Sequence, residues 1–356
     1  MTTIYITIFF FLLLAVFMCG QSNRALDGAF LVICFIVMTL LHTFVNPEYS
    51  DLYGYKLGFK EYQEMSLLKV INENAPSLKA ETGYRVFCKV ISFFTSEWRC
   101  AMFLISVVIL SGYYYTIKHY STMFWLSVLL IMVGPFTQSL FVLRQHMAMG
   151  IILFSYPYIL EKKFVPYILI CLLAISVHQT ALIFVPVYFI YNMRNSYMVI
   201  LVLLALFLFL YYFYSVIIST TASLAMSTAG YGDYYFENNS DGANSKMAFL
   251  LLAITIMRFF LLRNDFFKEG INKLISIILV MGTILAFVGV GYIGTSRLNM
   301  YYSASSFLFV PNTLQYIKRK DIRVIVGFSY FLFLLYFFVG NSNSQDMRDF
   351  WFFYKN

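Results

Sequence analysis

Eleven apolar runs make up most of this chain and limit the folds open to it. They cover residues 4–18, 30–45, 101–117, 122–133, 136–160, 164–190, 197–218, 247–262, 271–290, 298–316 and 324–339. Of the 356 residues, 61% are hydrophobic and only 12% are charged, a composition typical of polytopic membrane proteins. Because a backbone in lipid must pair its polar groups internally, each crossing must be helical. The sequence therefore predicts an all-α polytopic membrane protein with one transmembrane bundle over residues 1–356.

The distribution of Lys and Arg predicts how this bundle is oriented. The positive-inside rule assigns the loops that are rich in these residues to the cytoplasm, which places the N-terminus outside. The loops predicted to be cytoplasmic hold Arg24, Lys118, Lys162, Lys163, Arg194, Arg263, Lys268, Lys318, Arg319, Lys320 and Arg323. The alternation holds only if residues 164–190 enter and leave the membrane on the same side. A re-entrant helical hairpin bent at residues 177–179 meets this condition, and with it we expect about ten transmembrane helices.

Two polar segments, residues 46–99 and 219–246, are expected to lie outside the cell. The first has seven basic and seven acidic residues, so it is neutral rather than a basic tail. Within it, residues 81–94 place Tyr84, Phe87, Cys88 and Ile91 at helical spacing, which predicts an amphipathic helix. The second is rich in Gly, Ser, Asn and Tyr and is predicted to be a flexible loop.

Arg144, Gln145 and His146 lie together inside an apolar run, where polar residues are costly. All seventeen acidic residues lie outside the apolar runs, so Arg144 has no carboxylate partner within a span. An unpaired Arg at the bilayer centre costs about 2.5 to 3.5 kcal/mol. We therefore expect Arg144 to bind a loop carboxylate or an anionic ligand such as a lipid-linked phosphate, which its planar fork fits. The alternative is a structural role in which helix carbonyls and loop carboxylates hold the guanidinium.

The depth of Arg144 depends on where the preceding chain turns. A turn is predicted at Gly134 and Pro135, which places Arg144 about 15 Å below the outer surface at 1.5 Å per residue. His178, at the tip of the hairpin, would face the same outer half of the bundle, or it would only cap a broken helix. His146 is expected to pack.

Two further basic residues, Arg258 and Lys273, lie close to the ends of apolar runs. Their side chains are expected to extend along the helix to the cytoplasmic surface.

Several other chemistries lack support in the sequence. There is no CxxC, HExxH, phosphate-binding glycine loop or GxSxG, so zinc sites, nucleotide hydrolysis and serine-hydrolase chemistry have no motif. No cluster of metal ligands is evident, and we expect neither a metal nor another cofactor. The net charge is +8, but the basic residues follow the loops and form no patch, which argues against a nucleic-acid partner.

Three motifs along the chain resemble the EpsG family of bacterial exopolysaccharide proteins. The run LRQHMA at residues 143–148, the pair Lys162 and Lys163, and VHQTAL at residues 177–182 follow the family pattern of an LRQxxA helix and a later H-x-[ST]-A segment. Weaker similarities extend over most of the chain. They are Asn46 and Pro47 with Asp51 and Tyr53, the run from Glu81 to Tyr84, and Ser296 and Arg297 through Tyr301.

The resemblance implies a Wzy-type polymerase with a fold similar to that of C-type glycosyltransferases. Such a protein lies in the bacterial inner membrane with its active site facing outside. It would transfer a growing glycan between undecaprenyl-pyrophosphate-linked oligosaccharide units to make O-antigen, capsule or exopolysaccharide. Its partners would include the lipid bilayer and, in some systems, a flippase and a chain-length regulator.

This chemistry requires cations near the pyrophosphate, a base for the acceptor hydroxyl and surfaces for sugar. The expected pyrophosphate-binding residues are Arg144, Arg297 and Gln145. His178 is the first choice of base, since its ordinary pKa near 6.5 suits proton acceptance. The alternative bases are Asp51, Glu48 and Glu81. The tyrosines expected to stack on sugar are Tyr53, Tyr55 and Tyr84.

Two other functions stay open. A transporter or flippase of lipid-linked oligosaccharide would also need many spans, but no acid within a span offers a proton relay and no internal repeat is evident. A membrane acyltransferase that modifies the same glycan is the other alternative.

Overall fold

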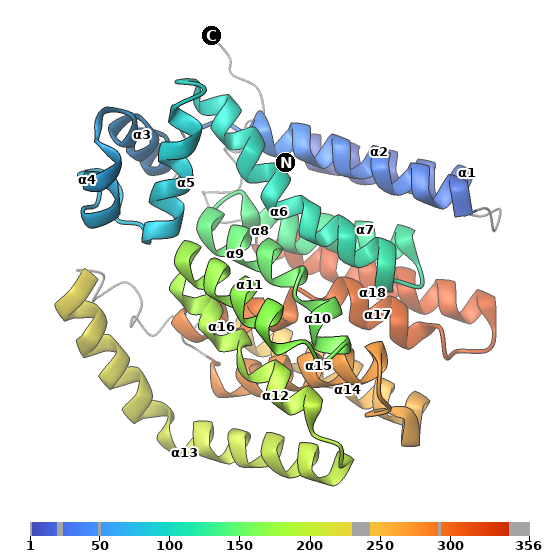
Figure 1. Ribbon diagram of the computed structural model, residues 1–356. Helices are drawn as coiled ribbons and strands as arrows, with labels where there is room; N and C mark the ends of the chain where they lie inside the picture. The colour runs from blue at the N-terminus through green and yellow to red at the C-terminus, as the bar shows by residue number, and fades with distance from the viewer. Residues whose placement is uncertain (1, 20–23, 49–50, 230–242, 291–292, 342–356) are drawn as a thin grey trace. The chain divides into compact units, whose positions relative to one another are not determined.

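The computed structural model describes residues 2–19, 24–48, 51–229, 243–290 and 293–341, and its regular structure is helical (Figure 1). Helix accounts for most of the described residues. Over the described ranges there is no β-strand, only an isolated bridge between Ala75 and Leu78. The predicted all-α class is therefore confirmed.

Five of the described helices are long and apolar enough to cross a membrane. They contain residues 25–43, 98–120, 196–213, 245–262 and 271–288. The corresponding elements are α2 (Arg24–Thr43), α6 (Trp98–Tyr120), α13 (Ser196–Ala229), α14 (Ala243–Leu262) and α15 (Ile271–Val288). Three shorter apolar helices cover residues 3–18, 124–139 and 164–177. These lengths agree with a polytopic membrane protein, and the count of about ten spans stays a prediction.

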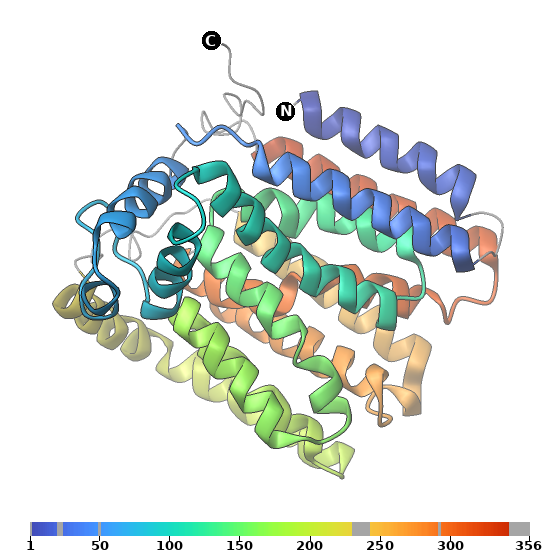
Figure 2. The same cartoon turned by 45° about the horizontal axis from the view of Figure 1, so that its top comes forward.

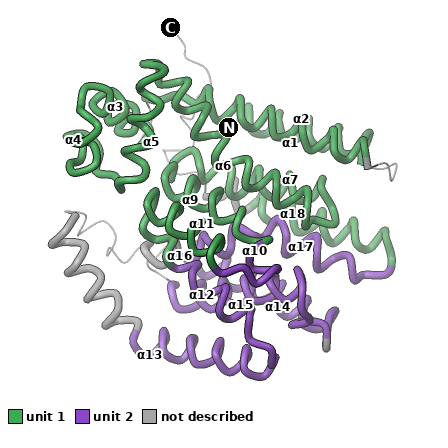
Figure 3. The backbone as a smooth tube through the Cα atoms, viewed as in Figure 1, with its two compact units in different colours: residues 1–157, 165–182, 319–356 green, residues 158–164, 183–318 purple. Residues whose placement is uncertain are grey.

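The chain divides into two compact units, which Figure 3 colours separately. The first contains residues 1–157, 165–182 and 319–356, and the second residues 158–164 and 183–318. The first unit includes α1 (Thr2–Met18), α2, α6, α9 (Leu143–Leu153), α11 (Phe164–Val177) and α18 (Lys320–Asn341). The second includes α12 (Pro186–Asn192), α13, α14, α15, α16 (Ile293–Ser303) and α17 (Ser306–Leu314).

Helix α6 packs between α2 and α9 in the first unit, and glycines allow the closest approach. A Cβ added at Gly112 of α6 would overlap the carbonyl oxygen of Gly150 in α9. A Cβ at Gly150 would lie 2.7 Å from the carbonyl oxygen of Ile109. Only glycine at both positions lets these two backbones cross in direct contact.

Residues 51–97 fold into three helices that Figure 2 shows together beside the start of α6. They are α3 (Asp51–Glu64), α4 (Leu67–Asn72) and α5 (Thr82–Ser92). The predicted amphipathic helix is α5, which buries Tyr84, Cys88 and Ile91. These side chains belong to a small core with Phe59 and Tyr62 of α3, both fully buried.

The predicted turn at Gly134 and Pro135 is wrong. Helix α7 (Phe124–Ile131) continues through a π-helical segment, η1 (Met132–Phe136), into α8 (Thr137–Ser139). Proline lacks an N–H and crowds the preceding turn of an α-helix, and the wider π turn accommodates it without ending the helix. A turn at residues 140–142 separates α8 from α9, and Arg144 is the second residue of α9. The depth counted from Gly134 and Pro135 therefore loses its starting point.

Two further predictions concern where helices end: the flexible loop at residues 219–246 and the hairpin bend at residues 177–179. Helix α13 extends to Ala229, so the first part of segment 219–246 is helical, and residues 230–242 lie outside the described residues. Alanine, leucine and methionine between residues 221 and 229 favour this continuation. Helix α11 ends at Val177 and the 3-10 helix η2 (Gln179–Phe184) follows, so the break at residues 177–179 is confirmed. The re-entrant course of the hairpin stays a prediction.

Arg258 and Lys273 do not extend to a surface in the second unit. Arg258 is fully buried, with Nε donating to the Ser276 hydroxyl at 3.0 Å and a terminal nitrogen to the Thr313 hydroxyl at 3.1 Å. Lys273 is 6% exposed and donates to the carbonyl oxygen of Met193 at 2.5 Å. Neutral oxygens of nearby residues accept their hydrogen bonds, so the predicted extension to the cytoplasmic surface is wrong.

Candidate active site

The carboxylate of Glu81 connects three separate segments of the first unit. Its Oε2 forms an ion pair with Arg144 of α9. Its Oε1 lies 2.7 Å from Nδ1 of His178, and the backbone N–H of Gln179 donates to the same oxygen at 3.3 Å. The side chains of Glu81, Arg144 and His178 are 14%, 15% and 17% exposed. We call Glu81, Arg144 and His178 the bridged cluster.

Local structure explains why these three side chains meet. Glu81 is the residue before α5, and its side chain makes no hydrogen bond to that helix. A Cβ at Gly83 would overlap the Ser176 hydroxyl and lie 2.6 Å from the Ser176 carbonyl oxygen, so the start of α5 presses against the end of α11. His178 follows α11 directly. Arg144 completes the cluster because the chain has just turned into α9.

Tyr55 contacts the guanidinium of Arg144 from another side, and Tyr84 packs against the Tyr55 ring. Its Nε donates to the hydroxyl of Tyr55 at 3.3 Å, and its guanidinium carbon lies 5.8 Å from the centre of the Tyr55 ring. The rings of Tyr55 and Tyr84 meet edge to face with centroids 5.8 Å apart. The position of Arg144 is therefore fixed by an anion, a hydroxyl and an aromatic face.

The charge state of Glu81 follows from its surroundings. Burial alone would raise the pKa of Glu81, but the hydrogen bond from His178 and the charge of Arg144 outweigh it and lower this pKa to about 2. Burial raises the pKa of Tyr55 despite the nearby Arg144, so its hydroxyl stays protonated. At neutral pH the cluster thus contains a carboxylate and a guanidinium.

The ionised carboxylate also determines the tautomer of a neutral His178. A carboxylate only accepts hydrogen bonds, so Nδ1 of His178 must donate. Nε2 then has a free electron pair, which is the form a general base requires. A cation that offsets negative charge and a histidine oriented by a carboxylate are thus brought together.

The structure brings some of the predicted site residues into this cluster and leaves others outside it. Three of them, Glu81, Arg144 and His178, form the bridged cluster. Two more, Tyr55 and Tyr84, lie beside it. Glu48 is exposed and pairs with Lys56 at 2.5 Å, and Asp51 is exposed at the start of α3. Gln145 is fully buried in α9, and Arg297 is half-buried in α16 of the second unit.

The three tyrosines predicted to stack on sugar differ in exposure. Tyr53 is 45% exposed, whereas Tyr55 and Tyr84 are 7% and 0% exposed. The two buried rings meet edge to face, and because they are buried they offer no surface to a sugar in this conformation. The contact from Gln179 could not be predicted, because every residue except proline has the same backbone donor.

His146 is fully buried, as a packing residue would be, but neither ring nitrogen has a hydrogen-bond partner within the described part of the chain. His42 of α2 is also fully buried, and its Nδ1 lies 2.7 Å from the hydroxyl of Ser106. Among the described residues, neither His42 nor His146 hydrogen-bonds to a carboxylate, whereas His178 does.

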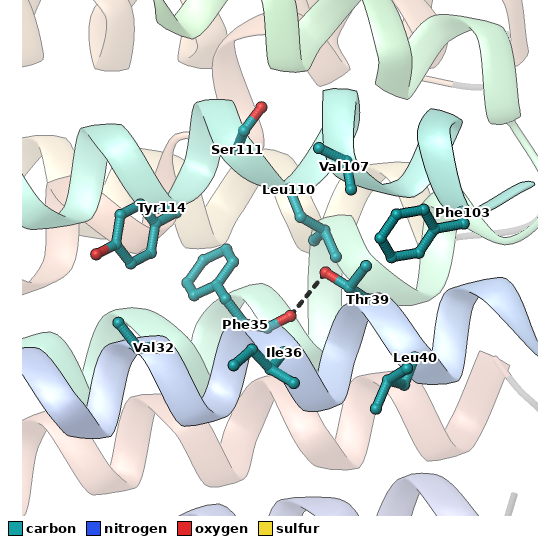
Figure 4. A pocket seen from close by; sticks show the side chains of 10 residues that line it. All are labelled: Val32, Phe35, Ile36, Thr39, Leu40, Phe103, Val107, Leu110, Ser111 and Tyr114. Carbon is teal, nitrogen blue, oxygen red and sulfur yellow. Dashed lines mark hydrogen bonds between the residues drawn. The ribbon is translucent and has the colours of Figure 1, made fainter.

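An apolar groove lies between α2 and α6, with a volume of about 480 Å³ (Figure 4). Its walls include Phe35 and Ile36 of α2 and Val107 and Leu110 of α6. The hydroxyl of Thr39 donates to the carbonyl oxygen of Phe35 at 2.7 Å and is therefore satisfied within its own helix. The groove has no charged side chain and suits a hydrocarbon chain rather than an anion.

Among the described residues, no three His, Cys, Asp or Glu side chains are grouped as metal ligands would be. Fold and site together define a helical, polytopic membrane protein in which a carboxylate links an arginine to a histidine.

A comparison with protein families assigns this membrane protein more closely. The model of the EpsG family matches residues 28–356, nearly the whole chain. The chain belongs to the EpsG family, a family of Wzy-type polysaccharide polymerases, which confirms the resemblance seen in the motifs. No match was found among curated proteins or among solved structures. The family places the protein in polysaccharide biosynthesis at a membrane.

Proposed function

We propose that this protein polymerises undecaprenyl-pyrophosphate-linked oligosaccharide units into O-antigen, capsule or exopolysaccharide. The reaction is a glycosyl transfer at the outer face of the bacterial inner membrane. The observation that supports it most directly is the bridged cluster, which places a cation beside a carboxylate–histidine pair in a member of a polymerase family. Both parts are needed for transfer with a pyrophosphate leaving group.

In the proposed reaction, Nε2 of His178 takes the proton of the acceptor hydroxyl. The acceptor oxygen forms a bond to the anomeric carbon of the growing glycan as the bond from that carbon to the pyrophosphate oxygen breaks. The electron pair of the broken bond leaves with the lipid pyrophosphate. Arg144 offsets the negative charge that develops there, and Glu81 orients His178 and stabilises its protonated form.

Other residues have smaller parts in the proposal. Asp51 is the alternative base, and Glu48 is less suited because it is bound to Lys56. Tyr53 offers an exposed ring for sugar. Arg297 and Gln145 are further candidates for pyrophosphate binding. The re-entrant course of residues 164–190 and an N-terminus outside the cell belong to the same proposal.

The decisive experiment uses purified protein in lipid nanodiscs with a defined undecaprenyl-pyrophosphate oligosaccharide. We expect a ladder of glycans that differ by one repeat unit, still attached to lipid. In proteoliposomes, movement of the lipid-linked substrate without elongation would instead identify a flippase. Modification of the glycan without elongation, in the presence of an acyl donor, would identify an acyltransferase. Either result would contradict the proposed function.

A further inference from the structure

Glu81 occupies the position on Arg144 that an anionic ligand needs. Its two oxygens accept from the Arg144 guanidinium, from Nδ1 of His178 and from the backbone N–H of Gln179. Phosphate oxygens accept from the same types of donor, and a guanidinium binds carboxylate and phosphate in the same planar way. The carboxylate of Glu81 therefore resembles one phosphate group in its hydrogen-bond pattern.

The Glu81 side chain can leave Arg144 without disturbing its helix. Glu81 precedes α5 with extended backbone angles, φ −67° and ψ 150°, and its side chain does not cap α5. Its backbone carbonyl, not its carboxylate, accepts the first helical hydrogen bond from Arg85. Rotation of the side chain thus breaks only its contacts with Arg144, His178 and the backbone N–H of Gln179.

The cluster is also open enough to be reached. The three side chains are 14% to 17% exposed rather than fully buried. The charges of the ionised Glu81 and of Arg144 offset each other. A ligand with two phosphate groups has more negative charge than one carboxylate, so it competes well for the guanidinium.

We propose that Glu81 is an internal placeholder for the substrate pyrophosphate, which displaces its Oε2 from Arg144 while Oε1 stays on His178. This inference rests on the proposed function and names how the substrate enters the site. Once released from Arg144, the carboxylate interacts more strongly with His178 and increases its ability to accept a proton. The base is thereby activated when the pyrophosphate is bound, which limits proton transfer at an empty site.

The test is the binding of a short-chain prenyl diphosphate to protein in nanodiscs, measured by titration calorimetry at constant salt. Glu81→Gln removes the competing charge and keeps the shape, so we expect this variant to bind about tenfold more tightly than the original protein. Glu73→Gln is the matched control, because Glu73 lies in the same segment with its side chain 62% exposed. It should leave the affinity unchanged. Adding Arg144→Gln to Glu81→Gln should abolish the gain.

Equal or weaker binding by a folded Glu81→Gln variant would overturn the inference, as would an equal gain in Glu73→Gln. If Glu81→Gln does not fold, Glu81→Asp replaces it. Aspartate is one methylene shorter and cannot span Arg144 and His178 together, so a smaller gain in affinity is expected, and no gain contradicts the inference. The polymerisation assay is independent: tighter binding without any ladder would support the placeholder and contradict the proposed polymerase.

Discussion

At the residue scale, Glu81 links the start of α9 to the break after α11 through one ionised group. The pKa of this carboxylate falls from its ordinary 4.5 to about 2 because the hydrogen bond from His178 and the charge of Arg144 outweigh the effect of burial. A lowered folded-state pKa means that Glu81 stabilises the fold fully above about pH 4.5, and this stabilisation is lost as the pH falls toward 2.

We therefore expect an acid-dependent stability difference between the original protein and Glu81→Gln. The shift corresponds to roughly 3 kcal/mol in favour of the original protein near neutral pH. The measurement is thermal unfolding in nanodiscs from pH 7 down to pH 3. The gap between the two melting temperatures should narrow below about pH 4.5, and a gap that does not change with pH would contradict the ionic role of Glu81.

The partner of Arg144 could be predicted only as a type of group. The absence of acids from the apolar runs indicated either a loop carboxylate or an anionic ligand. It did not indicate Glu81, because that contact requires the turn at residues 140–142, the start of α5 and the end of α11 to meet. The turn was instead predicted at Gly134 and Pro135, because proline usually ends a helix, whereas here Pro135 lies within a π turn. With the turn in the wrong place, the contact between Glu81 and Arg144 could not be predicted.

At the element scale, the crossing of α6 and α9 sets where α9 and its Arg144 lie. Both backbones touch at Gly112 and Gly150, and no side chain fits between them. The amphipathic helix α5 was predictable from its spacing of apolar residues. The glycine contact was not, because an isolated glycine in an apolar run has many possible meanings.

Gly112→Ala should push α6 and α9 apart. We expect a loss of about 1 to 3 kcal/mol in stability and a lower polymerisation rate, since overpacking shifts backbones. Gly28→Ala in α2 is the control, because a Cβ there meets no atom within 4 Å. The measurement is the melting temperature of each variant in nanodiscs. If Gly112→Ala melts at the same temperature as Gly28→Ala, the crossing tolerates a methyl group and the prediction is wrong.

At the scale of the whole molecule, composition predicted a helical membrane protein. The described residues confirm the all-α class, and five of their helices are long and apolar enough to cross a membrane. The number of spans is harder to predict, because apolar runs do not correspond one to one with helices. The run at residues 136–160 contains the end of one helix, a turn, α9 and α10 (Tyr156–Leu160). Hydropathy does not register a short turn whose residues are themselves apolar.

The proposed orientation can be tested by labelling engineered cysteines in intact cells. With the five native cysteines replaced, Glu73→Cys should react with a membrane-impermeant maleimide from outside. Lys163→Cys, at a site 60% exposed in the native protein, should react only after the membrane is opened. The reverse pattern would place α3 to α5 in the cytoplasm and contradict an outward-facing site.

The central claim is that the bridged cluster performs sugar transfer. The most direct measurement is the rate of glycan elongation by purified protein with His178→Ala or Arg144→Lys, each beside a matched control at an exposed position. The controls are His119→Ala and Arg99→Lys. We predict that the two cluster variants stay folded and elongate at least about a hundredfold more slowly, while both controls retain their rate. Full rate and full chain length in both cluster variants would contradict the claim.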